Sequence, residues 1–376
     1  MIGFKPQGGY GGYGGYGGYG GYGGYGGYGG YGGYGGYGGY GGYGGDGANP
    51  MQAEALNKVR DALSGPYNAA AITSPPMPAM DDVAQLRSWA MDVRLHVCQF
   101  ELVAPLLFSV KGANKAGVAH LDQAEPKPKQ VKRIVDLTRP STALFKQQLE
   151  LVMNWASLRE DRATEILAQA SNSSPFWASI LNLQPHKHKF TSELLILAQS
   201  FAVHVEMRLK HAFACPRPAE YSSQVQPMLT TPGHGTWPSG HGTEAFMTAR
   251  VLQELLGVLQ TSETDMQLQR LAARIAINRT VAGVHFPVDS AVGRLLGEAL
   301  AGYFVYRCAQ PAAGYKDRSF DGTQFTNARA VLDFDYHMPL QNTPTSPFNT
   351  EGATHTLTTQ SQVLKKLWDL AKDEWA

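Results

Sequence analysis

The sequence is poor in cysteine and has no long apolar run. Its three cysteines, Cys98, Cys215 and Cys308, are widely separated, and an odd set of this kind fits neither a disulfide framework nor a zinc site. The longest apolar stretches, 102–110 and 300–306, are much shorter than the roughly 18 residues that cross a bilayer. We therefore expect no structural metal, no disulfide framework and no membrane span.

An excess of charge of one sign is also missing. The 32 basic residues nearly balance the 31 acidic ones, which gives a net charge of +1, and no basic stripe with interleaved aromatic residues is present. This pattern argues against a nucleic-acid-binding protein. The start, MIGFKPQ, lacks the apolar core of a secretory signal, so the default expectation is a soluble cytoplasmic protein.

The most unusual segment is a Gly-Gly-Tyr repeat. Residues 8–43 are twelve uninterrupted triplets, and residues 44–50 resemble a linker. Two glycines in three cannot sustain an α-helix or a packed core, whereas a polyproline-II or polyglycine-II helix has three residues per turn and would place every tyrosine on one ridge. Two interpretations remain open: a disordered tail, or self-association through Gly8–Tyr43 into a filament, which would place the protein outside the cell or at its surface.

The rest of the chain has helical periodicity. Apolar residues recur at spacings of three and four, and strand-like alternation is scarce. The sequence therefore predicts an all-α helical bundle over residues 51–376, with a catalytic core at about 190–310, after a repeat tract and linker at 1–50. The predicted helices cover 51–63, 81–108, 143–170, 191–213, 241–259, 264–282 and 288–308. Residues 309–357 are predicted to be surface loop, followed by an amphipathic helix at 358–376 that packs on the bundle through Leu364, Leu367, Trp368 and Ala371.

One short stretch predicts an anion-binding helix entrance. The letters PSGH, Pro238 to His241, precede a helical run; Ser239 is a good N-cap and Gly240 allows close approach of a ligand. The free N–H groups and positive dipole end of a helix suit an anion, and His241 would lie within its reach. An ordinary capped helix is the simpler alternative for this stretch alone.

Two further motifs flank this entrance. KHAFACPRP places Lys210 seven residues before Arg217, and NRTVAGVHFPVD places Arg279, His285 and Asp289 at spacings of six and four. Three cations and a helix N-terminus are suited to holding a tetrahedral or trigonal-bipyramidal oxyanion such as phosphate. Histidines on opposite sides of that anion suit in-line displacement, in which one attacks and the other protonates the leaving group.

Together the motifs KxxxxxxRP, PSGH and RxxxxxHxxxD resemble the type 2 phosphatidic acid phosphatase and vanadium haloperoxidase superfamily. The resemblance covers about residues 190–310. KRIVDLTRP, with Lys132 and Arg139, satisfies the first motif too, but it lies nearly a hundred residues before PSGH, and we interpret it as surface charge. Asn278 departs from the phosphatase pattern, which has Ser, and fits the haloperoxidase branch. His234, five residues before Ser239, occupies a place where bromoperoxidases of the family carry a histidine.

The resemblance implies a mechanism without a metal. His285 would attack phosphorus, with Asp289 bonded to its other ring nitrogen, and His241 would protonate the leaving alcohol and later activate water. The phosphoryl oxygens of a small phosphate ester would be bound by Lys210, Arg217, Ser239, Gly240 and Arg279. His234 and Trp237 are candidate pocket residues, although Trp237 could instead pack beneath the loop.

Three functions remain open at this stage. The first is a soluble phosphomonoesterase that forms a phosphohistidine, either free or displayed on a filament. The second is a haloperoxidase, in which vanadate would be the cofactor and His285 its ligand. The third is a structural filament protein that carries a vestigial enzyme.

Overall fold

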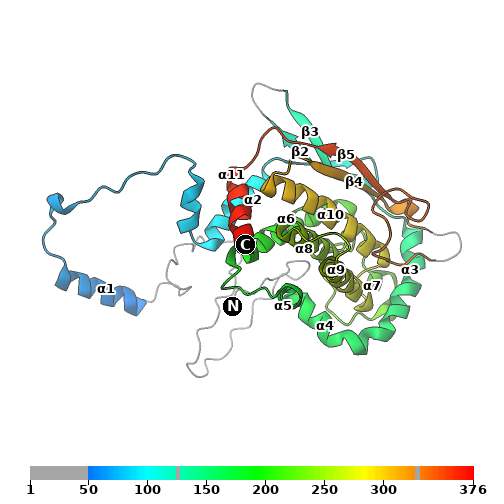
Figure 1. Cartoon of the computed structure of the whole chain (residues 1–376). Helices are drawn as coiled ribbons and strands as arrows, with labels where there is room; N and C mark the ends of the chain where they lie inside the picture. Colours follow the sequence, from blue (N-terminus) through cyan, green and yellow to red (C-terminus); the bar gives the residue numbers. More distant parts are fainter. Residues whose placement is uncertain (1–49, 124–127, 327–330) are drawn as a thin grey trace. The chain divides into compact units, whose positions relative to one another are not determined.

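The computed structural model describes residues 50–123, 128–326 and 331–376 (Figure 1). The Gly-Gly-Tyr tract therefore lies outside the described residues, and so do the helix and the self-association predicted for it. The described chain falls into two compact units that meet in sequence between His96 and Val97. No helix among the described residues is long and apolar enough to cross a membrane.

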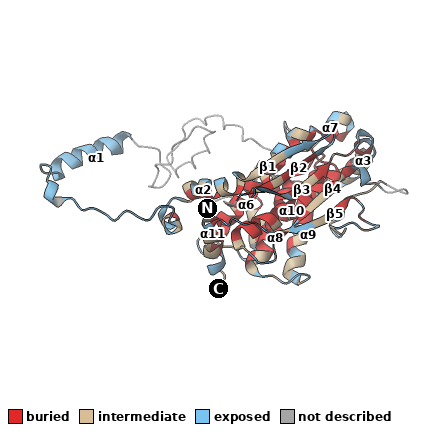
Figure 2. Cartoon of the chain, turned by 90° about the horizontal axis from the view of Figure 1, so that it is seen from above, coloured by how far each residue is buried: buried red, intermediate tan, exposed pale blue. Residues whose placement is uncertain are grey.

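The smaller unit contains few buried side chains. It comprises α1 (Pro50–Leu63), two short 3-10 turns, η1 (Ala69–Ala71) and η2 (Val83–Ser88), and the first residues of α2 (Met91–Val103). All residues of α1 are exposed (Figure 2).

The larger unit combines helices with a sheet, so the prediction of an all-α fold is wrong. The sheet has five strands in the order β1-β2-β3-β4-β5, with β3 and β4 parallel and the other pairs antiparallel. Figure 1 shows it along one side of the helices, above α10. The strands are β1 (Leu106–Lys111), β2 (Lys115–Asp122), β3 (Gln130–Thr138), β4 (Tyr315–Asp321) and β5 (Asn349–His355).

The strands were missed because buried polar residues interrupt their alternation. In β4, YKDRSFD, the side chain of Asp317 is buried and accepts a 2.8 Å hydrogen bond from Arg133 of β3 and a 2.6 Å bond from His355 of β5. Such cross-strand bonds satisfy a buried carboxylate without giving the sequence an apolar, polar alternation. Residues 309–357 are therefore not all surface loop, and the helix predicted to reach residue 108 ends at Val103.

The helices predicted at 191–213, 241–259, 264–282 and 288–308 agree with the structure within a few residues. The helix predicted at 143–170 is interrupted at residues 156–158, and the helix predicted at 81–108 begins only at Met91. In chain order after β3, the helices are α3 (Thr142–Trp155), η3 (Ala156–Leu158), α4 (Arg159–Ser171), α5 (Ser174–Leu181), α6 (Lys189–Phe213), α7 (Pro218–Tyr221), η4 (Ser223–Val225), α8 (Gly240–Leu256), α9 (Glu263–Val281), α10 (Pro287–Ala309), η5 (Gly322–Gln324) and α11 (Gln362–Asp373). The core lies where α6 and α10 meet the sheet and where α8 packs on both helices (Figure 2). The predicted packing of the C-terminal helix is confirmed, since its four apolar residues are buried and α11 contacts α6 and α10.

The contact between α8 and α10 brings two of the sequence motifs together. A Cβ at Gly297 of α10 would lie 2.5 Å from the carbonyl oxygen of Thr243 in α8, so only glycine allows the two helices to approach this closely. At the N-terminal end of the same contact, the amide of Ser239 donates a 3.0 Å hydrogen bond to the carbonyl of Asp289. The PSGH stretch is thereby held against the first turn of α10.

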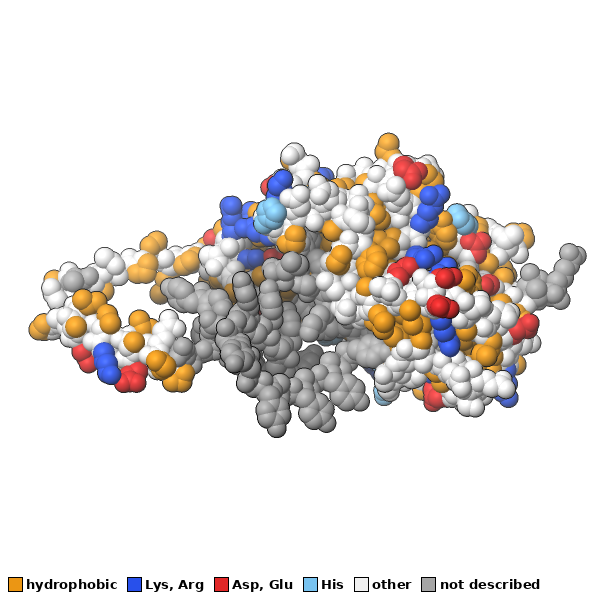
Figure 3. Space-filling model, turned by 90° about the horizontal axis from the view of Figure 1, so that it is seen from below, with side chains coloured by type: hydrophobic (Ala, Val, Ile, Leu, Met, Phe, Trp, Pro, Cys, Tyr) orange, Lys and Arg blue, Asp and Glu red, His pale blue; other side chains and the backbone are white. Residues whose placement is uncertain are grey.

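On the face drawn in Figure 3, acidic and basic side chains are interspersed among the described residues. The drawn face shows no broad patch of a single sign over those residues.

Candidate active site

The PSGH stretch forms the helix entrance that its sequence predicts. Ser239 is the N-cap of α8, and its Oγ accepts a 3.2 Å hydrogen bond from the amide of Gly242. Gly240 lines a small cavity at this entrance. A Cβ at Gly240 would lie 2.6 Å from Oε1 of Glu206 in α6, so close packing as well as ligand approach favours glycine here.

His285 is held by a carboxylate and a hydroxyl. Its Nδ1 lies 2.9 Å from Oδ2 of Asp289 and 3.1 Å from Oγ1 of Thr236, and that hydroxyl itself donates to Oδ2 of Asp289. Asp289 stands in the first turn of α10, which Pro287 begins, as the sequence predicts, and its Oδ2 also accepts the amide of Phe286 at 2.9 Å. The imidazole therefore carries its proton on Nδ1, and its lone pair lies on Nε2.

Electrostatics keep this histidine neutral. Burial lowers the pKa of His285 well below its usual value, and the nearby charges of Arg217 and Lys210 lower it further. Burial also raises the pKa of Asp289 to about 6, against the opposing effect of the bond from Thr236. A neutral imidazole is the nucleophilic form, so the site favours attack by Nε2 at physiological pH.

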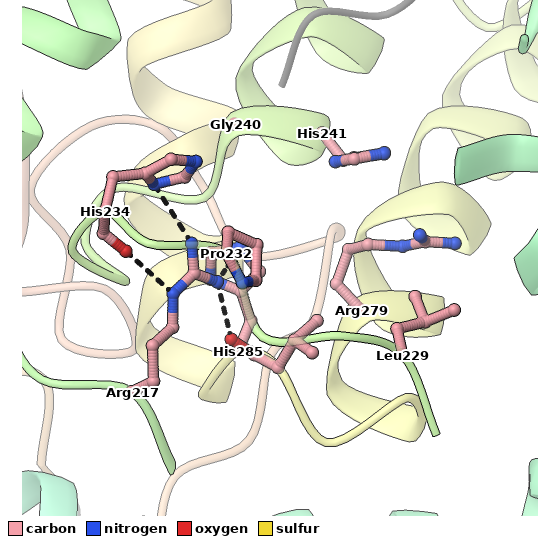
Figure 4. A pocket seen from close by; sticks show the side chains of 9 residues that line it. Arg217, Leu229, Pro232, His234, Gly240, His241, Arg279 and His285 are labelled. Carbon is pink, nitrogen blue, oxygen red and sulfur yellow. Dashed lines mark hydrogen bonds between the residues drawn. The ribbon is translucent and has the colours of Figure 1, made fainter. Parts of the chain in front are cut away.

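Arg217 lies directly over that nitrogen (Figure 4). Its Nη1 donates to Nε2 of His285 at 3.1 Å and to the carbonyl of Val284 at 2.7 Å. Its Nη2 bonds Nδ1 of His234 at 3.1 Å, and its Nε bonds the carbonyl of the same residue at 3.1 Å. The guanidinium is thus fixed beside Nε2 of His285, where its paired N–H groups could instead bind an oxyanion.

Arg279 and His241 lie on the other side of the cavity (Figure 4). Nη2 of Arg279 is positioned by the carbonyl of Ile166 at 3.1 Å and by Oε1 of Gln169 at 3.4 Å, both in α4. Burial and the neighbouring cations, Arg279 first among them, lower the pKa of His241 well below its usual value. Its Nε2 has no hydrogen-bond partner among the described residues. A negatively charged ligand would offset these cations and favour a proton on His241.

The cavity between these groups is small. Its volume is about 10 Å³, roughly one water molecule, so side chains that line it must move to admit a phosphoryl group. The cavity is lined by Arg217, Leu229, Pro232, His234, Gly240, His241, Arg279, Val284 and His285.

Besides Asp289, which acts through its bond to His285, three predicted site residues do not line this cavity. The ammonium of Lys210 is buried and donates to the carbonyls of Gly235 and Thr236 at 3.3 Å each, and to that of Pro238. It therefore clamps the loop before PSGH and acts on the cavity through its charge. Ser239 serves as the cap described above, and Trp237 is buried edge-on against Phe213, at 4.6 Å between ring centroids. Of the two predicted alternatives for Trp237, the structure shows packing beneath the loop.

Asn278 joins two helices. Its amide nitrogen donates to Glu165 at 2.8 Å and to Gln169 at 2.9 Å, and its oxygen accepts from Arg162 at 3.2 Å. These bonds tie α9 to α4, the helix that positions Arg279. In the structure, the asparagine at this position therefore has a packing role.

Two features of the site are not predicted from the sequence. Thr236 lies in a Gly-rich loop 49 residues before His285, where no spacing rule indicates a contact. Glu206 and Glu244 are buried without a hydrogen-bond partner among the described residues, and burial raises the pKa of both, that of Glu206 to about 7. Glu206 could have been identified from the sequence, because it lies four residues before Lys210 and so on the same face of the helix.

Together these features form a site whose chemistry suits a tetrahedral oxyanion between a neutral histidine and a second histidine. Residues 191–312 match the PAP2 superfamily, so the predicted resemblance to the type 2 phosphatidic acid phosphatase and haloperoxidase superfamily is confirmed for that part of the chain. No curated protein matches the chain. The family match supports an enzyme of the phosphoesterase or haloperoxidase type.

Proposed function

We propose that this protein hydrolyses phosphate monoesters through a phosphohistidine formed on His285. The observation that carries the proposal is the orientation of the imidazole: Asp289 and Thr236 hold Nδ1, and Nε2 faces Arg217 in the cavity. Arg279 and His241 lie across the same cavity, where the other side of the phosphoryl group would be. A small phosphate ester is the proposed substrate.

In the first step, Nε2 of His285 attacks phosphorus and the bond from phosphorus to the ester oxygen breaks. His241, protonated in the presence of the substrate dianion, transfers its proton to the departing oxygen, which leaves as an alcohol. Arg217 moves from Nε2 to a phosphoryl oxygen, and Arg279 with the Gly240 amide stabilises the remaining charge. Asp289 stabilises the positive charge that develops on the imidazole.

In the second step, water attacks the phosphohistidine. His241, now neutral, accepts a proton from that water, the phosphorus–nitrogen bond breaks, and Nε2 regains its lone pair. Inorganic phosphate leaves, and the enzyme returns to its starting protonation state. The net reaction is one ester and one water to one alcohol and one phosphate.

The second candidate function is a vanadate-dependent haloperoxidase. The observation that favours it is His234, whose ring lines the cavity and bonds Arg217. The donor set fits vanadate, because Nε2 of His285 supplies a nitrogen ligand and Arg217 and Arg279 suit the oxyanion. Bound vanadate would supply peroxide activation, and the residues of this chain would hold and orient it.

The self-assembly interpretation stays a prediction about Gly8–Tyr43, outside the described residues. If tract and enzyme are separable, a chain without residues 1–46 keeps its catalytic activity and loses assembly. Loss of both would show that the tract is not separable.

A paired assay on one purified sample tests the choice between the two chemistries. One half receives a chromogenic phosphate monoester, the other vanadate, peroxide, bromide and a halogen acceptor, with His285→Ala as the blank. Phosphate release that vanadate inhibits, without bromination, supports the phosphatase. Vanadate-dependent bromination with negligible hydrolysis would replace it with the haloperoxidase, and inactivity in both would favour a structural role.

A further inference from the structure

A second, larger cavity adjoins the segment that carries Arg217. Its volume is about 360 Å³, within the range of sites for small organic ligands. Residues 214–216 line this cavity, whereas Arg217 lines the catalytic one, and the two cavities share no lining residue. The larger cavity is therefore a separate space beside the catalytic one.

The charge of the second cavity comes from Arg139. This residue was predicted to be surface charge, but it is half-buried, and its Nη1 donates a 2.9 Å hydrogen bond to the carbonyl of Phe213 at the end of α6. Among the described residues, no acidic residue lines the cavity and Arg139 forms no ion pair. A guanidinium that is held in place and is not ion-paired favours a carboxylate or phosphate ligand.

Two aromatic rings form another part of the wall. The rings of Phe145 and Tyr221 lie 6.1 Å apart between centroids, and both pack on Phe286, at 4.9 and 5.7 Å. The Tyr221 hydroxyl makes no hydrogen bond within the described part of the chain, and burial raises the pKa of that hydroxyl, so it stays a donor. Aromatic walls beside a cation suit a ligand that is flat at one end and anionic at the other.

The start of α3 adds to the preference for an anion. Thr142, its first residue, lines the cavity, and Ser141 caps the helix by accepting the amide of Leu144 at 3.2 Å. The positive end of this 14-residue helix therefore lies at the same wall as Arg139. The helix dipole adds to the attraction that Arg139 exerts on an anion at this wall.

We propose that this cavity binds an organic anion with a carboxylate or phosphate group on a single planar ring. Arg139 and the Tyr221 hydroxyl bind the anionic group, and Phe145 and Tyr221 pack against the ring. The proposal concerns binding alone and does not depend on the activity of the catalytic cavity.

The test is equilibrium binding to the full chain by titration calorimetry, with benzoate and phenylphosphonate as probes. We expect saturable binding of at least one probe, weakened about tenfold or more in Arg139→Gln and about two- to tenfold in Tyr221→Phe. Arg270→Gln, the same change at an exposed arginine, leaves the affinity unchanged. Arg279→Gln, in the catalytic cavity, also leaves it unchanged.

The two probes distinguish the sources of the anion. Arg139-dependent binding of benzoate alone identifies a carboxylate ligand, and Arg139-dependent binding of phenylphosphonate alone a phosphate ligand. Failure of both probes to bind overturns the proposal. Binding that is lost in Arg279→Gln and unchanged in Arg139→Gln also overturns it, because the probe then occupies the catalytic cavity. Tyr221→Phe keeps the ring packing, so it provides a test if Arg139→Gln fails to fold.

Discussion

Arg217 donates a 3.1 Å hydrogen bond to Nε2 of His285, the atom that attacks phosphorus in the proposed reaction. The lone pair is occupied while this bond exists, so an incoming phosphoryl oxygen must take over the guanidinium before attack. In this account, binding of the oxyanion to Arg217 is also the step that frees Nε2 of His285 from its hydrogen bond.

Substitution of Arg217 by lysine tests this coupling. A lysine keeps the charge but loses the fork that reaches both His285 and a phosphoryl oxygen. We expect kcat/KM for an aryl phosphate to fall by about 10²- to 10³-fold. Arg270→Lys, on the surface, is the matched control, and an Arg217→Lys enzyme as active as wild type would contradict the assigned role.

Thr236 gives a prediction about pH. Its bond to Asp289 lowers the pKa of that carboxyl, which burial raises to about 6. Because Asp289 must be ionised to orient His285, kcat/KM is expected to decline as the pH falls below about 6. Thr236→Val removes the bond, raises the pKa of Asp289, and so moves this decline to higher pH.

The pH profile of kcat/KM checks this, with Thr236→Ser, which retains the hydroxyl, as the control. We also expect Thr236→Val to lower kcat by about 10- to 100-fold, a typical loss for groups that orient a functional histidine. A profile identical to wild type would show that Thr236 does not act through Asp289.

The buried Glu206 gives a prediction about stability. Burial raises its folded pKa to about 7, above the unfolded value, so protonation stabilises the folded state below the unfolded pKa and this contribution is lost as the pH rises toward 7. Glu206→Gln mimics the protonated form. Its free energy of unfolding relative to wild type should therefore rise between about pH 4.5 and 7, by on the order of 2 kcal/mol.

Urea unfolding at pH 5 and pH 7.5 measures this difference. Glu263→Gln, at an exposed position of α9, should show no such trend. If the wild type and Glu206→Gln keep a constant difference across this window, Glu206 does not exchange a proton on folding.

The helix contact that joins the motifs is tested at Gly297. An alanine there would place its Cβ 2.5 Å from the carbonyl oxygen of Thr243, and we expect a loss of about 1–3 kcal/mol in the free energy of unfolding. Gly302, in the same helix, has no atom within 4 Å of a Cβ, so Gly302→Ala should stabilise by about 0.5–1 kcal/mol. Similar effects at both positions would argue against the close approach of α8 and α10.

Local signals explain which parts of the structure the sequence predicts. A cap at Ser239, a proline at 287 and a spacing of four from His285 to Asp289 all act within one helix turn, and all appear in the structure. Contacts across long sequence separations leave no such signal. The bond from Arg133 to Asp317 joins residues 184 positions apart in the sequence. It allows a charged residue to be buried in β4, so this strand lacks the apolar and polar alternation that would predict it.

The position of Lys210 shows a different limit. Its spacing from Arg217 correctly places both near PSGH, but spacing does not say which acceptor an ammonium reaches. In the structure its bonds go to loop carbonyls, because the buried end of α6 lies beneath that loop.

The most direct test of the account is a search for the phosphorylated enzyme in His241→Gln. With an aryl phosphate whose leaving group needs no proton, the first step still proceeds, while the second lacks the group that activates water. Rapid quenching under alkaline conditions followed by mass spectrometry should find phosphate accumulated on His285. Turnover of the ester with no phosphate on His285, or with phosphate on another residue, would contradict the proposed mechanism.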